Sequence, residues 1–346
     1  MSNATGTIRC GVIGVGRMGR HHTRVYSQIP GAELVGVVDP NRQRCEEVIG
    51  EFGGSAFQTI EQLLDAGVDA VTIATPTIHH RAAAELLLSN GVACLIEKPL
   101  AADEGEASKI VRAAERAGVA LQVGHIVRYD PVMVAIRAIR GLEPRFIEVD
   151  RISPMTFRSA DVGVVLDMMI HDLDLLLMLI GAEPEEIQAS AVCVLGEAED
   201  VCNARLTFPA DAGAGGRCVA NLTASRLALK TERKMRIICE DAYISADFVN
   251  RSGTVVRKAA NESKLAEIRE QLKAGADLSS INYLELVNIE QLRIGEGEPL
   301  RLQIEDFLDA MRTGRRPEVD VHAGFAAVRT AQRIVEAARA AGARMV

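Results

Sequence analysis

The chain has 346 residues, about twice the usual length of one domain, so we expect two domains. Its formal net charge is −8 and it has no long run of Lys and Arg, which excludes nucleic acid and anionic membranes as partners. Hydrophobic residues make up 48% of the chain but aromatic residues only 3%, which favours an aliphatic α/β core.

The cysteines and the apolar segments bear on the cell compartment. Seven cysteines are scattered, odd in number and free of any CxxC pair, which is typical of reduced thiols in the cytosol. The most apolar later segment, Leu175–Ile180, is too short to span a membrane, and residues 1–14 lack the pattern of a signal peptide. We therefore expect a cytoplasmic protein.

Residues 8–124 alternate between short β-rich segments and segments with apolar residues at helical spacing. This alternation predicts a parallel sheet covered by helices, which we assign to a first domain over residues 1–125. The predicted strands are Ile8–Ile13, Glu33–Asp39, Ala70–Ala74, Ala93–Glu97 and Leu121–Gly124.

A glycine motif, GVGRMG at residues 14–19, directly follows the first predicted strand and begins a helix. Gly14 permits a tight turn, Gly16 lets the backbone approach a pyrophosphate, and Gly19 lets helix and strand pack closely. The helix N-terminus adds free N–H groups and a partial positive charge. A glycine-rich turn that binds nothing is the alternative, but the flanking strand and helix favour a Rossmann fold, a doubly wound parallel sheet that binds a dinucleotide.

Asp39 ends the second predicted strand, where a carboxylate can accept hydrogen bonds from the adenosine ribose. Arg17 and Met18 lie inside the glycine motif and belong to the same cofactor-binding turn. Because the Asp39 carboxylate would repel a 2′-phosphate, we favour NAD over NADP as the cofactor. Arg42 and Arg44 nearby keep NADP open as the alternative.

The second half, residues 126–346, has a different pattern, which predicts an α+β domain with an open, largely antiparallel sheet. A charged helix plus loop at residues 259–283 is inserted in it, and we leave open whether the last helix packs back on the first domain. The predicted helices are Val132–Ile139, Asp167–Ile180, Gln303–Arg312 and Gly324–Ala341, and the predicted strands are Phe146–Ile152, Ile187–Leu195, Val201–Phe208, Cys218–Ser225, Met235–Cys239, Tyr243–Phe248 and Thr254–Arg257.

Two further motifs lie at the carboxyl ends of predicted strands, ATPTIHH at residues 74–80 and EKP at residues 97–99. Ligands of open α/β sheets bind at these ends, so both motifs should face the nicotinamide half of the cofactor. Together with the glycine motif they resemble the Gfo/Idh/MocA oxidoreductase family, and the EKP motif is the most specific part. The resemblance covers essentially the whole chain, including GHIVRY at residues 124–129, which is similar to that family's junction between domains.

The resemblance implies a catalytic set of Lys98, Asp167 and His171. Asp167, His171 and Asp174 are spaced i, i+4 and i+7, which places them on one face of a helix. Met169 stands where the family often has glycine, a difference that would narrow the pocket. The cofactor contacts that the resemblance implies, besides the glycine motif and Asp39, are Ala74, Thr75, Pro76, His80, Glu97 and Lys98.

Hydride transfer from a secondary alcohol needs a group that takes the hydroxyl proton. We expect His171 to be this general base, Asp167 to orient it, and Lys98 to lower the pKa of the alcohol. Each residue also has a structural alternative: Asp167 as a helix N-terminal acid, His171 as a core histidine, Lys98 as a solvated loop residue. We expect no metal site, because no second histidine shares the helix face.

Residues 151–158, 167–174 and 221–226 resemble a branch of the family that oxidises the 3-hydroxyl of UDP-N-acetylglucosamine. A nucleotide-sugar site needs donors for a pyrophosphate, and Arg158 and Arg226 are our candidates. Surface ion pairs are the alternative role for either arginine.

Arg128 and Asp174 are further expected substrate contacts, although Arg128 also suits an anchor between domains. Two other functions stay open: a dehydrogenase of a free polyol or sugar such as an inositol, and a non-catalytic NAD-sensing protein. The resemblance also implies a homodimer or homotetramer.

Overall fold

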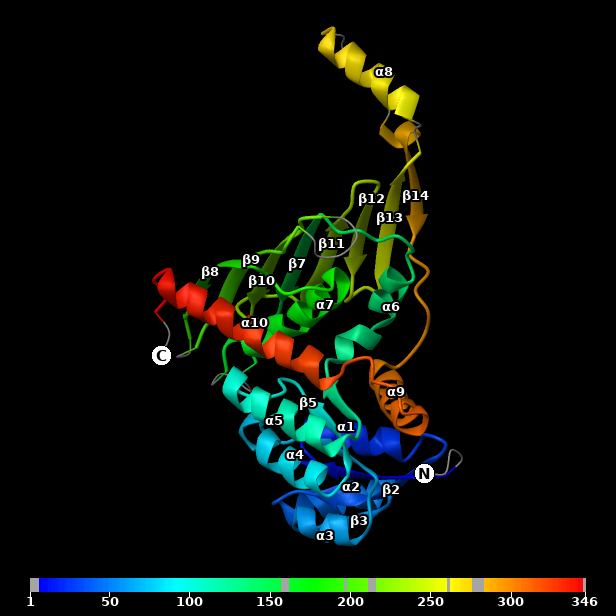
Figure 1. Ribbon diagram of the computed structural model, residues 1–346, viewed down its shortest axis with the longest axis vertical. Helices are drawn as coiled ribbons and strands as arrows, with labels where there is room; N and C mark the ends of the chain where they lie inside the picture. The colour runs from blue at the N-terminus through cyan, green and yellow to red at the C-terminus, as the bar shows by residue number, and fades with distance from the viewer. Residues whose placement is uncertain are drawn as a thin grey trace.

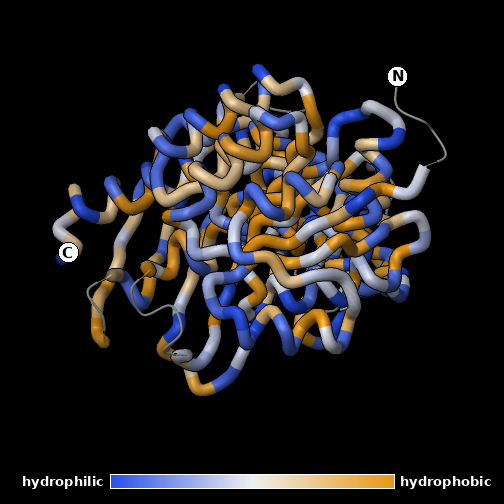
Figure 2. Tube along the Cα trace, turned by 90° about the horizontal axis from the view of Figure 1, so that it is seen from below, coloured by the Kyte–Doolittle hydropathy of each residue, from blue (hydrophilic) through white to orange (hydrophobic). Residues whose placement is uncertain are grey.

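The computed structural model describes residues 6–156, 162–195, 198–210, 216–259, 262–275 and 283–344. These residues form two sheets, one of six strands and one of eight, which follow one another along the long axis of the molecule (Figure 1). Hydrophobic segments run through the middle of the molecule when it is seen from below (Figure 2). None of the described helices is both long enough and apolar enough to cross a membrane.

All strands of the first sheet are parallel, in the order β3-β2-β1-β4-β5-β6, which is the doubly wound Rossmann arrangement. The predicted Rossmann fold is therefore confirmed. Strand β3 was not predicted, because two of its three residues are exposed and it has no apolar alternation. The strands are β1 (Ile8–Ile13), β2 (Ala32–Val38), β3 (Ser55–Phe57), β4 (Ala70–Ile73), β5 (Ala93–Glu97) and β6 (Leu121–Gly124).

Helices cover both faces of this sheet, so every residue of β4 and β5 is buried. Side-chain caps from Asn41, Thr59 and Asp103 accept first-turn N–H groups at the starts of three helices. The helix after the glycine motif starts at Gly16 with no side-chain cap, so its first N–H groups remain for another partner. The helices are α1 (Arg17–Tyr26), α2 (Arg42–Phe52), α3 (Ile60–Asp65), α4 (His80–Ser89) and α5 (Glu104–Ala117).

The second sheet has the order β14-β13-β12-β11-β7-β10-β9-β8, and all its pairings are antiparallel except that of β7 with β10. The predicted open, largely antiparallel sheet is confirmed. Strand β14 was not predicted, because four of its five residues are exposed. The strands are β7 (Phe146–Ile152), β8 (Glu186–Val192), β9 (Val201–Thr207), β10 (Val219–Ser225), β11 (Glu232–Ile238), β12 (Ala242–Asp247), β13 (Ser252–Lys258) and β14 (Val287–Gln291).

Helices α6 (Pro131–Arg137), α7 (Ile170–Ile180) and α10 (Val321–Ala340) lie on one face of this sheet (Figure 1). Burial accordingly alternates along the central strands, and α7 is apolar along most of its length. The side chains on the opposite face stay partly exposed. Helix α8 (Glu262–Lys273) extends beyond the end of the sheet (Figure 1).

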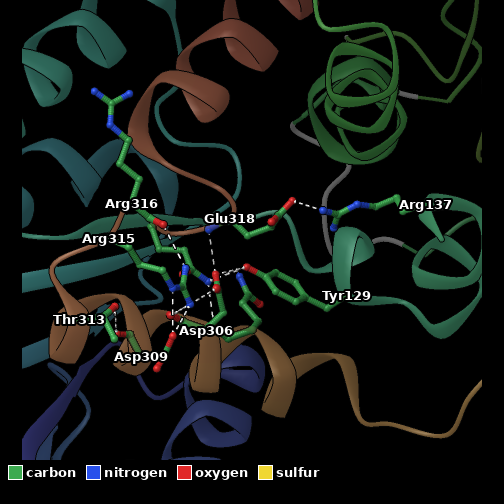
Figure 3. A network of polar contacts seen from close by, with 10 residues as sticks. Tyr129, Arg137, Asp306, Asp309, Thr313, Arg315, Arg316 and Glu318 are labelled. Atoms are coloured by element: carbon green, nitrogen blue, oxygen red, sulfur yellow. Dashed lines mark hydrogen bonds and ion pairs between the residues drawn. The ribbon is translucent and has the colours of Figure 1, made fainter. Parts of the chain in front are cut away.

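The C-terminal helices join the two halves. Helix α9 (Pro299–Thr313) adds Ile304 and Phe307 to the apolar cluster of β1 and α1, while α10 packs against both α5 and α7. The last helix therefore does pack back on the first domain. A polar network supports this joint (Figure 3): the Asp306 carboxylate accepts hydrogen bonds from Tyr129 Oη at 2.7 Å, Glu318 N at 2.9 Å and Arg315 Nη2 at 2.7 Å.

Candidate active site

The glycine motif forms a tight turn against the neighbouring loop. Gly14 has φ +82°, and a Cβ added there would lie 2.8 Å from the Ala74 carbonyl oxygen. A Cβ on Gly19 would lie only 1.7 Å from the Gly14 carbonyl oxygen. Both positions therefore require glycine, one for its backbone conformation and its neighbour and the other for close packing.

Gly16 has a different environment, because no atom lies within 4 Å of a Cβ added there. It is the N-cap of α1, whose first turn carries no acidic residue and no side-chain cap. Arg17 is exposed and Met18 half-buried just after it. Open space in front of uncapped N–H groups at a helix N-terminus fits a pyrophosphate.

Asp39 lies at the carboxyl end of β2, beside this turn, and is 7% exposed. Its Oδ2 accepts a hydrogen bond from Val15 N at 2.9 Å, and its Oδ1 accepts one from Asn41 N at 2.8 Å. Arg44 Nη1 lies 3.6 Å from Oδ2. Each carboxylate oxygen has more than one lone pair, so Asp39 can still accept a ribose hydroxyl.

The loop after β4 contacts the glycine turn through Ala74, and Pro76 is exposed on its outer side. Thr75 Oγ1 is buried with no hydrogen-bond partner among the described residues, so a polar ligand could satisfy it. His80 requires a correction to its expected cofactor contact. Its ring is 1% exposed, with Nε2 3.0 Å from Thr75 O and Nδ1 3.0 Å from Pro99 O, so it links two loops instead of facing the cofactor.

Glu97 of the EKP motif is also buried, and its Oε1 lies 2.7 Å from His22 Nε2. Burial opposes ionisation, but the hydrogen bond from His22 and the charges of His22 and Lys98 lower the pKa of Glu97. Sequence reasoning missed His22. Its signal was its place on the buried face of α1, three residues after Gly19 and four before Tyr26.

Lys98 meets Asp167 from the other half of the chain. Lys98 Nζ lies 3.1 Å from Asp167 Oδ1 and 2.7 Å from the Asp167 carbonyl oxygen. Asp167 lies in η4 (Val165–Met169), a π-helical turn that leads into α7, and such turns are frequent at functional sites. Both side chains keep some exposure, 20% for Lys98 and 34% for Asp167, so a ligand can reach the pair.

His171 is half-buried on the first turn of α7, and its Nδ1 has no hydrogen-bond partner among the described residues. Burial, followed by the charges of Lys98 and Arg151, lowers the pKa of His171 well below its usual value. The imidazole is therefore neutral at pH 7 and can accept a proton. The His125 ring stands edge-on to it, with the ring centroids 6.3 Å apart.

Asp167 does not take the role of orienting His171. The Asp167 side chain contacts Lys98 instead, and the Lys98 ammonium donates to both the side chain and the carbonyl oxygen of Asp167, which fixes the position of that ammonium group. The shared helix face that the spacing predicted is also altered by the π-helical turn, which adds residues between successive turns of the helix.

The arginines and the aspartate expected to bind substrate have other partners. Arg128 Nη2 lies 2.6 Å from Asp174 Oδ1, and both side chains are at least nine-tenths buried, so this pair joins the segment after β6 to α7. Arg226 Nε lies 2.6 Å from Asp200 Oδ1 in an equally buried pair. Buried ion pairs hold the side chains of Arg128, Asp174 and Arg226, which corrects three predicted substrate contacts. Arg158 lies outside the described residues.

Two family models match the chain: an oxidoreductase family with an NAD-binding Rossmann fold over residues 8–125, and the GFO/IDH/MocA C-terminal domain over residues 131–245. UDP-N-acetylglucosamine 3-dehydrogenase of Acidithiobacillus ferrooxidans is 37% identical over 317 residues, which covers 92% of this chain and 93% of that one. The chain belongs to the Gfo/Idh/MocA oxidoreductase family. Its first domain is therefore an NAD-binding domain, as predicted.

Other members of the Gfo/Idh/MocA family are also similar. The NAD-dependent scyllo-inositol 2-dehydrogenase of Bacillus subtilis is 32% identical over 231 residues, which covers 62% of this chain and 68% of that one. A solved structure of the A. ferrooxidans enzyme has a TM-score of 0.84 at 36% identity, covering 96% of this chain and 98% of that chain. Levoglucosan dehydrogenase with NADH and levoglucosan has a TM-score of 0.80 at 17% identity over 96% and 97%, a likeness in fold.

Proposed function

We propose that this oxidoreductase uses NAD to oxidise the 3-hydroxyl of UDP-N-acetylglucosamine to the 3-keto sugar. The observation that carries the proposal is the ion pair of 3.1 Å between Lys98 of the NAD-binding domain and Asp167, with His171 one helical turn after Asp167. The chain is also 37% identical, over 92% of its length, to a UDP-N-acetylglucosamine 3-dehydrogenase.

Each residue of the site has a separate role in alcohol oxidation. NAD, when bound, accepts the hydride. Lys98, held by Asp167, donates a hydrogen bond to the substrate hydroxyl and favours its ionised form. His171, kept neutral by its surroundings, takes the hydroxyl proton as the carbon–hydrogen bond breaks.

The NAD-binding residues are proposed on the same basis. The uncapped N-terminus of α1 at Gly16 would hold the pyrophosphate, and Asp39 would accept the adenosine ribose hydroxyls. Thr75, whose hydroxyl lacks a partner among the described residues, would face the nicotinamide half. The repulsion between Asp39 and a 2′-phosphate favours NAD over NADP.

A polyol dehydrogenase is the second candidate, because relatives that act on inositols reach 32% identity and an inositol ring offers the same secondary hydroxyl. A non-catalytic NAD sensor is disfavoured, since the Lys98 and His171 side chains would then be retained in a reactive arrangement without use.

The test is formation of NADH, followed at its absorbance band, on mixing the protein and NAD with UDP-N-acetylglucosamine, free N-acetylglucosamine or myo-inositol. We expect the highest kcat/KM with UDP-N-acetylglucosamine, and its loss in Lys98→Met. The variant Lys109→Met, which removes an exposed lysine paired with Glu106 on α5, is the control and should keep full activity. A higher kcat/KM with myo-inositol would select the second candidate, and NAD binding with no turnover of any compound would select the sensor.

We also propose a homodimer or homotetramer in the cytosol. The open face of the second sheet, with its partly exposed side chains, is the surface that a second copy would cover. The cysteines, all in the described part of the chain, are thiols, in keeping with a reducing compartment. Light scattering after size-exclusion chromatography would test the assembly, and a monomeric mass would refute it.

A further inference from the structure

Three arginines lie in a row at one end of the helix-covered face of the second sheet. Arg151 of β7 stands directly opposite Arg233 of β11 in the antiparallel register. On its other side Arg151 pairs with Ala224 of β10, and Arg226 lies two residues further along on the same face. We call Arg151, Arg226 and Arg233 the arginine row.

Two members of the arginine row have a carboxylate partner. Arg151 binds Asp172 through two hydrogen bonds of 2.6 and 2.7 Å, and Arg226 binds Asp200 at 2.6 Å. Arg233 makes no side-chain hydrogen bond or ion pair with any residue that the structure describes, although it stands next to a like charge. Arg233 is exposed, so water can solvate its guanidinium group. Like charges directly opposite each other in a sheet repel, however, and an anion that contacts both Arg233 and Arg151 would remove that repulsion, which points to a ligand.

Another arginine, Arg251, lies at the same end of the second sheet as Arg233. Phe248 N donates to the Arg233 carbonyl oxygen at 2.9 Å, so the turn between β12 and β13 packs beside Arg233. Arg251 lies in that turn with φ +48°, a conformation that favours glycine. Within the described ranges its side chain, too, has no ion-pair partner.

The acidic groups near this end do not neutralise the two cations. The Asp130 carboxylate accepts a hydrogen bond from Val132 N at 2.9 Å, where it caps α6. Burial raises the pKa of Asp130, and the charges of Arg251 and Arg233 oppose that rise, although neither arginine forms an ion pair with Asp130 among the described residues. Asp172, the other acid facing Arg233, is held by Arg151.

This surplus of positive charge adjoins the proposed general base. The charges that lower the pKa of His171 come from Lys98, Arg151, His125 and Arg233, after the effect of burial. Lys98 and Arg151 form ion pairs with Asp167 and Asp172, whereas Arg233 forms none with any described residue. Arg151, which stands opposite Arg233, is bound to the residue that follows His171, so the arginine pair lies close to the general base. An anionic part of the substrate bound there would lie next to the reacting hydroxyl group.

We propose that Arg233, with Arg251 beside it, binds the diphosphate of the substrate and selects a nucleotide sugar over a neutral polyol. Guanidinium groups form paired, charge-assisted hydrogen bonds with phosphate oxygens, and two of them match two phosphates. The inference rests on the proposed function for the identity of the sugar. In this proposal Arg233 takes the pyrophosphate-binding role that the sequence predicted for Arg226, whose side chain is held by Asp200.

The test compares Arg233→Gln with the wild type on two substrates, UDP-N-acetylglucosamine and free N-acetylglucosamine. Loss of a charge-assisted contact should raise KM for the nucleotide sugar by about 10- to 100-fold and leave kcat within about threefold. The kcat/KM for the free sugar should not change. Arg233→Lys should recover part of the lost affinity, and Arg233→Gln/Arg251→Gln should raise KM for the nucleotide sugar further than Arg233→Gln alone. The control is Arg217→Gln, which removes the same charge by breaking an exposed pair with Glu185.

An unchanged KM for UDP-N-acetylglucosamine in Arg233→Gln would overturn this proposal and leave the proposed function intact. Equal losses on both substrates would also overturn it, because they would indicate a general positioning role. If the wild type oxidises no nucleotide sugar, the proposed function fails. Calorimetric titration with UDP then tests separately whether Arg233 binds a diphosphate. Weaker UDP binding in Arg233→Gln than in Arg217→Gln would support the site, and equal binding would overturn it.

Discussion

The cofactor edge of the first sheet and the arginine row of the second depend on their sequences in different ways. At the cofactor edge the backbone dictates the residue: any side chain at Gly19 would collide with the Gly14 carbonyl oxygen. In the arginine row all three residues are arginine, and the role of each depends on whether a carboxylate is bound to it. Arg151 and Arg226 are held by carboxylates in the interior, whereas Arg233 forms no ion pair with any described residue.

The comparison shows that the role of a residue can be inferred from its neighbours in sequence where backbone geometry excludes every other residue type. The role of a charged side chain cannot be inferred in that way. A buried ion pair and a ligand-binding arginine look identical in sequence, and only the carboxylate partners that the folded chain brings near separate them. The following experiments test this distinction, beginning with the residue where the two regions meet.

His171→Ala should cause the largest effect on catalysis. Loss of the general base should lower kcat by about 10²–10⁴-fold, while NADH binding, measured by fluorescence titration, stays unchanged. A variant with near-normal kcat would remove His171 from the proposed role and leave Lys98 as the principal catalytic group.

Arg151→Met should destabilise the fold far more than Arg233→Met. Asp172 is 3% exposed, and leaving it unpaired should lower the free energy of unfolding by about 3–5 kcal/mol in urea titrations. Arg151→Met/Asp172→Leu should recover most of this loss. Arg233→Met should change stability by no more than about 0.5 kcal/mol. Similar losses for Arg151→Met and Arg233→Met would contradict the distinction between structural and ligand-binding arginines.

Two glycines of the same motif should respond differently to alanine. Gly19→Ala should lower the free energy of unfolding by about 1–3 kcal/mol, because its Cβ meets backbone. Gly16→Ala should leave stability nearly unchanged and weaken NAD binding about tenfold, since its Cβ would enter the space for the pyrophosphate. Equal NAD affinity in Gly16→Ala and the wild type would move the pyrophosphate away from α1.

Acid should destabilise the protein through its buried histidines. Burial lowers the pKa of His80, His125 and His171 from 6.5, so below that pH the unfolded chain takes up protons that the folded chain does not. Stability should therefore fall as the pH drops below 6.5, until the folded-state pKa values are reached. His125→Phe should reduce this slope by up to about 1.4 kcal/mol per pH unit, and an unchanged slope would mean that His125 is protonated in the folded state.

The sequence predicted the fold well because the three signals it used are local. The alternation of strands and helices, the glycine motif and the EKP motif each lie within a few residues. The short, exposed strands β3 and β14 were missed, since neither buries enough apolar surface to leave a periodic pattern.

The candidate site was harder to predict, because it depends on pairings between distant residues. Asp167 bonds Lys98, 69 residues away in the chain, and not the neighbouring His171. The His80 ring lies in the interior, within hydrogen-bond distance of the Thr75 and Pro99 carbonyl groups. Arg128 and Asp174 form an ion pair with one another. Arg233 had no motif around it, and the strand register that aligns it with Arg151 is a property of the folded sheet.

Transfer of deuterium from carbon 3 of the sugar would test the central claim most directly. With UDP-N-acetylglucosamine deuterated at that carbon, the site described here predicts that the reduced cofactor gains one mass unit and that NADH formation slows. Reduced cofactor of unchanged mass would show that the hydride comes from elsewhere, and would contradict oxidation of the 3-hydroxyl at Lys98 and His171.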